Sequence, residues 1–231
     1  MTNEAVVAAA VAALVAAMAA SQLPLLLTRL PEPAEPAEGK PLYVDLAGTP
    51  RLASWCALVA GVAAGVIGAV LGLAASLPAW IYLCAVGVGL SFIDWRTKLL
   101  PRRIVVPSYL IVGAVLVVAA LATSEWGSLV RAAIGLAATF GVFLLMWLVY
   151  PRGLGYGDVR LSGVLGMALA WEGWPQLVLG LYAAFVLGGI IGAVLSAFKI
   201  VDRKGYPFGP FLMFGAWFAV VIGPSVTDWW G

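Results

Sequence analysis

The stretch Leu154-Gly155-Tyr156-Gly157-Asp158-Val159-Arg160 places an acid between two glycines and the start of an apolar run. Taking a carboxylate out of water penalises its charged form unless another group compensates. Only one other acid, Asp94, lies in a comparable place, at the end of the apolar run 80–93. The other nine of the 11 acidic residues fall in polar segments or near the termini. These two aspartates at the edges of apolar runs are therefore the feature to explain.

The composition is that of a membrane protein. Hydrophobic residues make up 63% of the 231 residues, charged residues only 10%, and the mean hydropathy is +1.04. Because a soluble domain usually contains about 25% charged residues, we expect an all-α, polytopic membrane helix bundle. The chain has no histidine, so acid–base chemistry must rest on carboxylate, Tyr, Lys or Cys side chains. Cys56 and Cys84 form no CxxC pair and are interpreted as small buried side chains, and we expect no metal and no cofactor.

Eight apolar runs are long enough to predict about eight transmembrane helices in a single membrane-embedded domain, residues 1–231. We expect the first run to be a retained helix, because Glu4 precedes it and no A-x-A site precedes a soluble domain. The sixth run is short and contains glycine, so it could cross only part of the bilayer. The runs lie at about 5–27, 55–75, 78–94, 104–122, 129–150, 158–172, 175–198 and 208–226.

The longest polar stretch covers residues 28–54 and contains five prolines. Proline at that density prevents a regular helix, so we expect a cytoplasmic surface loop or a small irregular cap. Its acids Glu32, Glu35 and Glu38 lead to the hypothesis that the loop attracts a basic peptide.

The distribution of basic residues orients the predicted helices. With eight spans and the N-terminus outside, 12 of the 13 Lys and Arg residues fall in inner segments, and Arg131 is the exception. The positive-inside rule selects this topology, and seven-span schemes lose the agreement. The same topology places Asp94, ending the third span, and Asp158, opening the sixth, at one cytoplasmic edge.

Two carboxylates close together in a poorly hydrated site cannot easily both ionise, so they share a proton. Such a pair can activate a water, with one carboxylate as general base and the other as acid toward a scissile carbonyl. Gly155 and Gly157 would supply backbone angles closed to other residues and room for a peptide to approach. A purely structural interpretation stays open for each acid. Asp158 could simply start a helix, and Asp94 could pair with Arg96 or Lys98.

Three segments together resemble the type IV prepilin peptidases, which are GxGD membrane aspartic endopeptidases. The first is Asp94-Trp95-Arg96-Thr97-Lys98-Leu99-Leu100-Pro101, with Pro107 following. The second, Gly155-Tyr156-Gly157-Asp158-Val159-Arg160-Leu161, is similar to the family's GxGDxK/RL signature. The third, Pro207-Phe208-Gly209-Pro210, is similar to the PFGP segment that opens the last helix in bacterial members.

The resemblance implies that Asp94 and Asp158 are the catalytic pair and that the segments around them shape the site. It also implies a peptidase facing the cytoplasm in the cell membrane. Its partners would be the lipid bilayer and a prepilin or pseudopilin precursor with a short basic leader, with no nucleic acid. Many members carry a cytoplasmic zinc domain with paired CxxC motifs and an N-methyltransferase activity. Residues 28–54 contain no cysteine, which argues against that activity here. The residues expected to shape the substrate site are Gly155, Tyr156, Gly157, Pro207, Phe208, Gly209 and Pro210.

Three alternatives remain. A small transporter could use Asp94 and Asp158 as a proton or cation site, although we find no internal repeat. The second alternative is an inactive structural subunit of a secretion or pilus machine. A signal-peptide-peptidase-like protease also uses GxGD, but it is expected to carry a YD pattern and a PAL motif. Here the sequence reads Ile93-Asp94-Trp95 and PFGP. The expected substrate groove could be lined by Trp95, Tyr156 and Phe208, although aromatic residues at membrane interfaces are ordinary anchors.

Overall fold

The computed structural model describes residues 2–32, 40–151, 153–197 and 207–230, which form ten α-helices and no β-strand. The chain divides into two compact units, Met1–Leu99 and Leu100–Gly231. The sequence prediction of an all-α fold is therefore confirmed.

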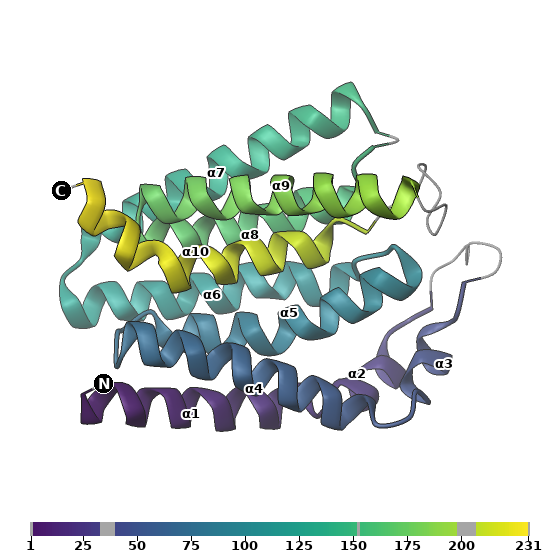
Figure 1. The fold of residues 1–231 in the computed structure, drawn as a ribbon, viewed down its shortest axis with the longest axis horizontal. Helices are drawn as coiled ribbons and strands as arrows, with labels where there is room; N and C mark the ends of the chain where they lie inside the picture. The colour runs from purple at the N-terminus through teal and green to yellow at the C-terminus, as the bar shows by residue number, and fades with distance from the viewer. Residues whose placement is uncertain (1, 33–39, 152, 198–206, 231) are drawn as a thin grey trace. The chain divides into compact units, whose positions relative to one another are not determined.

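The N-terminal unit is built on a close pair of helices, α1 (Asn3–Ala20) and α4 (Leu52–Leu71), which lie side by side in Figure 1. A Cβ on Gly68 would lie 2.7 Å from the carbonyl oxygen of Ala8, and one on Gly61 3.2 Å from that of Ala13. Small residues therefore let the two backbones approach. The other helices of this unit are α2 (Leu23–Arg29), α3 (Tyr43–Ala47) and α5 (Leu77–Thr97).

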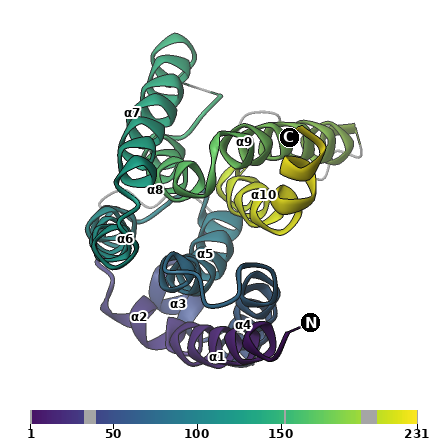
Figure 2. The ribbon, with the colours of Figure 1, turned by 90° about the vertical axis from the view of Figure 1, so that its left-hand side faces the viewer.

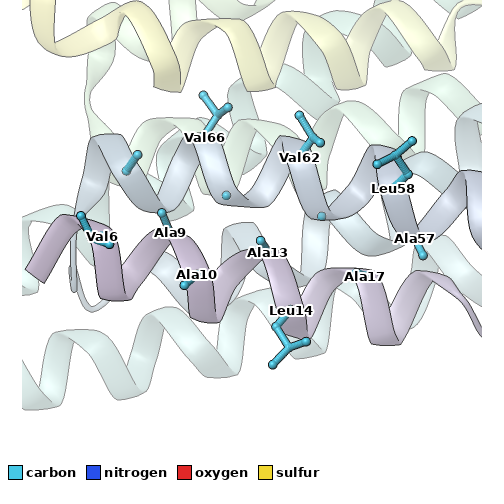
Figure 3. Close-up of a pocket in the computed structure, with 13 residues that line it drawn as sticks. Val6, Ala9, Ala10, Ala13, Leu14, Ala17, Ala57, Leu58, Val62 and Val66 are labelled. Carbon is cyan, nitrogen blue, oxygen red and sulfur yellow. The ribbon is translucent and has the colours of Figure 1, made fainter. Parts of the chain in front are cut away.

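An open groove runs along α1 and α4 (Figure 3). Every side chain that lines it is apolar, or absent in the case of glycine. The groove offers no acid, base or nucleophile, so it is a packing or lipid-facing surface and not a candidate for the catalytic site.

The C-terminal unit is arranged around α8 (Tyr156–Glu172), which is the helix that Asp158 opens. Nearly all of α8 is buried, from Asp158 to Trp171. It packs against the other four helices of the unit, and Figure 2 shows it lying against α7. A Cβ on Gly166 would lie 2.7 Å from the carbonyl oxygen of Gly135 on α7, so these helices also approach at glycines. The four other helices are α6 (Arg102–Thr123), α7 (Trp126–Val149), α9 (Trp174–Ala197) and α10 (Gly209–Trp230).

All eight predicted apolar runs fall on helices, with α1 and α2 together making the first. Among the described residues, six segments are long and apolar enough to cross a membrane, judged by length and composition. The helix α8 has 17 residues and is shorter than these segments. The helix α10 runs over 22 residues, from Gly209 to Trp230. The count of eight spans and the outside position of the N-terminus stay predictions. The six segments are Asn3–Arg29, Leu52–Leu71, Leu77–Thr97, Arg102–Thr123, Trp126–Val149 and Trp174–Ile191.

Part of the polar stretch 28–54 is helical, which its proline content did not predict. The helix α3 forms between Pro41 and Pro50, where no proline interrupts the chain. The Glu32 carboxylate accepts hydrogen bonds from the backbone N–H groups of Tyr43 (2.9 Å) and Val44 (3.0 Å). These are donors that a helix start leaves without intrahelical partners. Glu32 therefore already serves as a cap, and Glu35 and Glu38 lie outside the described residues.

Candidate active site

Asp94 lies in the last turn of α5 and is 4% exposed. The helix runs three residues beyond the predicted apolar run, to Thr97, so Asp94 is held inside a turn and not at its free end. Its backbone carbonyl accepts a hydrogen bond from the N–H of Lys98 at 2.7 Å. The sequence therefore places a buried acid at the negative end of a helix dipole, a position that disfavours a carboxylate unless positive charge is near.

Lys40 supplies such a charge. Its ammonium nitrogen donates a hydrogen bond to the carbonyl of Thr97 at 2.5 Å. Burial and the ammonium group of Lys98 lower the pKa of Lys40, while the carboxylate of Asp94 acts in the opposite sense. Sequence reasoning missed this residue, because 57 positions separate it from Thr97 and no motif marks it.

Asp158 lies in the first turn of α8 and is 7% exposed. Its Oδ2 accepts a hydrogen bond from the backbone N–H of Gly155 at 3.2 Å, the geometry of half a capping box. Asp158 therefore does lie at the start of a helix and caps it, as the structural interpretation expects. This position does not exclude a reacting role, since the side chain is also buried at the edge of an apolar helix.

The unusual backbone angles expected at the two signature glycines are not found, while their role in giving a peptide room to approach stays a prediction. Gly155 has φ −73° and ψ 142°, an ordinary extended conformation, and Gly157 lies within α8 without a positive φ. What excludes a larger residue at Gly157 is packing. A Cβ there would lie 2.8 Å from the Cβ of Leu100, and one on Gly155 would lie 3.1 Å from Oδ2 of Asp158.

Tyr156 is 39% exposed and contacts two side chains, those of Trp147 and Arg160. The centroid of its ring lies 5.0 Å from that of Trp147 on α7. The guanidinium carbon of Arg160 lies 4.4 Å from the centroid of the Tyr156 ring. The Tyr109 hydroxyl donates a hydrogen bond to the backbone carbonyl of Arg160 at 2.5 Å. The first turn of α8 is therefore fixed by α6 and α7. Trp147 and Tyr109 carried no signal in the sequence.

The PFGP segment starts α10, and Phe208 belongs to a cluster of aromatic rings. Its centroid lies 5.2 Å from that of Phe185 and 6.3 Å from that of Phe143. Pro207 and Gly209 are buried, while Phe208 and Pro210 are half-buried. Phe208 is therefore at least partly a packing residue.

The predicted site residues fall into both units. Asp94 belongs to the N-terminal unit, while Gly155, Tyr156, Gly157, Asp158 and the segment 207–210 belong to the C-terminal unit. Within the C-terminal unit, the signature residues Gly155 to Asp158 form the N-cap and the first turn of α8. The pairing of Asp94 with Asp158 stays a prediction. Among the described residues, no three Asp, Glu or Cys side chains lie close enough to hold a metal ion.

A model of the type IV leader peptidase family matches residues 80–196. The chain belongs to this family. The matched region includes both Asp94 and Asp158 and ends before Pro207. Together with the six apolar helices, membership establishes a multi-pass membrane protein.

Three curated relatives named "Prepilin leader peptidase/N-methyltransferase" illustrate the similarity. The Pseudomonas putida protein is 36% identical over 177 residues, covering 74% of this chain and 57% of its own. The Stutzerimonas stutzeri protein is 34% identical over 145 residues, covering 61% and 48%. The Aeromonas hydrophila protein is 30% identical over 167 residues, covering 68% and 52%. The chain thus spans about half the length of the curated relatives it matches. No solved structure matches.

Proposed function

We propose that the chain is an aspartic endopeptidase that removes the short basic leader from type IV prepilin or pseudopilin precursors. Asp94 and Asp158 are its catalytic pair. The observation that carries the proposal is that both acids are buried at helix ends inside the region matched by the family. Neither the family match nor the relatives support the transporter alternative.

The chemistry follows from two carboxylates that share one proton. The ionised carboxylate takes a proton from a water, whose oxygen attacks the carbonyl carbon of the scissile peptide bond. The protonated carboxyl first supports the carbonyl oxygen, and a proton then passes to the departing amine as the C–N bond breaks. The pair titrates as a unit, so base and acid are roles of the pair and are not assigned to one residue.

The substrate class fits a site at the cytoplasmic edge of the membrane. A basic leader lies in water while the apolar helix of the precursor stays in lipid, and the cut falls between them. Tyr156, which is partly exposed beside Asp158, and the segment 207–210 contribute to the shape of this site. We attribute peptidase activity alone to the chain, because residues 28–54 contain no cysteine for a four-cysteine zinc site.

The test is co-expression with a prepilin that carries a basic leader, followed by mass spectrometry of the N-terminus of the product. The expected result is one cut at the boundary between the leader and the apolar helix. A precursor that stays intact beside a correctly inserted chain would contradict the proposal. The matched control is a precursor in which the glycine expected before the cut is replaced, since the family cleaves after a glycine at that boundary.

A further inference from the structure

Lys40 reaches the end of the helix that carries Asp94. Its ammonium nitrogen donates a hydrogen bond to the carbonyl of Thr97 at 2.5 Å. Thr97 is the last residue of α5 and is 3% exposed, so its carbonyl is one that no intrahelical N–H reaches. A cation at such a carbonyl interacts favourably with the negative end of the helix dipole. The contact therefore fastens the segment before α3 to the C-terminal end of α5.

The end of α5 is tightly ordered around this contact. The Thr97 hydroxyl donates to the carbonyl of Ile93 at 2.8 Å, and the N–H of Lys98 donates to the carbonyl of Asp94 at 2.7 Å. Lys98 adopts a left-handed conformation with φ 58°, which turns the chain away from the helix. Asp94 precedes Thr97 by three positions, so the two residues share one face of α5.

Lys40 has two charged neighbours that act on it, Lys98 and Asp94. Because a Coulombic interaction is mutual, the ammonium group of Lys40 also acts on the carboxylate of Asp94. Asp158, the proposed catalytic partner of Asp94, belongs to the other unit. The remaining titratable groups of the N-terminal unit that the structure describes on or beside its helices are Glu4, Arg29, Glu32, Tyr43, Asp45, Arg51, Cys56, Tyr82, Cys84 and Arg96.

Resting on the proposed function, we propose that Lys40 is a positioning residue for Asp94. It ties the segment before α3 to the end of α5 and holds a positive charge beside the carboxylate that reacts. No signature of the sequence contains this residue, and its role comes from the contact with Thr97.

The test is the pH profile of kcat/KM for cleavage of a prepilin peptide by the purified full chain in detergent. Lys40→Met removes the charge and the donor, Lys40→Gln removes the charge and keeps an N–H donor, and Lys40→Arg keeps both. Arg103→Met is the matched control, because it removes one exposed positive charge from the first turn of α6. Each profile is normalised to its own maximum, so a lower yield of folded protein does not move it.

For Lys40→Met and Lys40→Gln we expect the acidic limb to move to higher pH by about 0.5 to 1 unit. This lowers normalised kcat/KM by about three- to tenfold at a fixed pH on that limb. For Lys40→Arg and Arg103→Met, the acidic limb of the pH profile should stay at the wild-type pH. A wild-type limb in both neutral variants, or an equal shift in Lys40→Arg, would overturn the role of Lys40. If the wild type itself cleaves no prepilin peptide, the failure lies with the proposed function and not with Lys40.

Discussion

The carboxylate of Asp158 accepts a hydrogen bond from the backbone N–H of Gly155, so the acid that we assign to catalysis also caps its own helix. The GxGD signature thus places the acid three residues after the residue that it caps. One carboxylate oxygen is engaged by the turn, and the side chain is held at the buried end of α8. Because Asp158 has both roles, substitutions that keep or remove the capping oxygen can distinguish its contribution to stability from its contribution to catalysis.

Asp158→Asn keeps an oxygen that can accept from Gly155, whereas Asp158→Ala removes it. We expect Asp158→Asn to melt close to the wild type in detergent and Asp158→Ala to lose about 1 kcal/mol of stability, the usual cost of a lost cap. Thermal unfolding followed by circular dichroism measures both. Equal stability of the alanine variant and the wild type would show that the cap contributes nothing.

Gly157→Ala should lower both stability and cleavage. The added Cβ would lie 2.8 Å from the Cβ of Leu100, which cannot move without shifting the backbone. We expect a destabilisation of about 1–3 kcal/mol, as for other overpacked sites. The matched control is Gly141→Ala on α7, where an added Cβ meets nothing within 4 Å.

Because alanine favours a helix interior over glycine, the Gly141 control should gain about 0.5–1 kcal/mol. Similar melting temperatures for the two glycine variants would show that Leu100 does not constrain the signature.

Arg131 fixes the other end of α8. Its guanidinium donates hydrogen bonds to the carbonyls of Ala170 and Trp171, both in the last turn of the helix. Arg131→Ala leaves two carbonyls of buried residues without this donor, so we expect a loss of about 1–3 kcal/mol. Arg103→Ala, at an exposed position on α6, should change the melting temperature little. An unchanged melting temperature for Arg131→Ala would contradict the capping role.

Trp147 packs on Tyr156 in the first turn of α8, the turn that also carries Asp158, with the two ring centroids 5.0 Å apart. Trp147→Phe keeps an aromatic partner, while Trp147→Ala removes a contact worth about 0.5–1.5 kcal/mol. We therefore expect kcat/KM for prepilin cleavage to fall about two- to tenfold in the alanine variant and to stay near wild type in the phenylalanine variant. An equal loss of kcat/KM in both variants would show that aromatic packing on Tyr156 is not what supports cleavage.

Sequence reasoning identified what depends on local pattern. Apolar run length located the helices, and the cost of burying a carboxylate singled out Asp94 and Asp158, both of which are buried. It could not identify contacts between residues far apart in the chain. Lys40 with Thr97, Trp147 with Tyr156 and Leu100 with Gly157 are of this kind.

One wrong prediction and one unexplained residue have the same origin. The glycines were assigned unusual backbone angles because a turn is the local reason for glycine, whereas for Gly157 the reason is the side chain of Leu100. Arg131 stood out as the one basic residue on the wrong side of the predicted topology. Its contact with the end of α8 gives it a structural role that the positive-inside rule does not consider.

The most direct test of the central claim compares prepilin cleavage by the wild type, Asp94→Asn, Asp158→Asn and the double variant, each reconstituted in lipid at equal amounts. We predict that each single variant inserts and folds but loses about 100-fold or more in kcat/KM, because each half of an acid–base pair is required. The double variant should be little worse than either single variant, since the two residues act as a unit. Cleavage near the wild-type rate by either single variant would remove that aspartate from the mechanism and contradict the assignment.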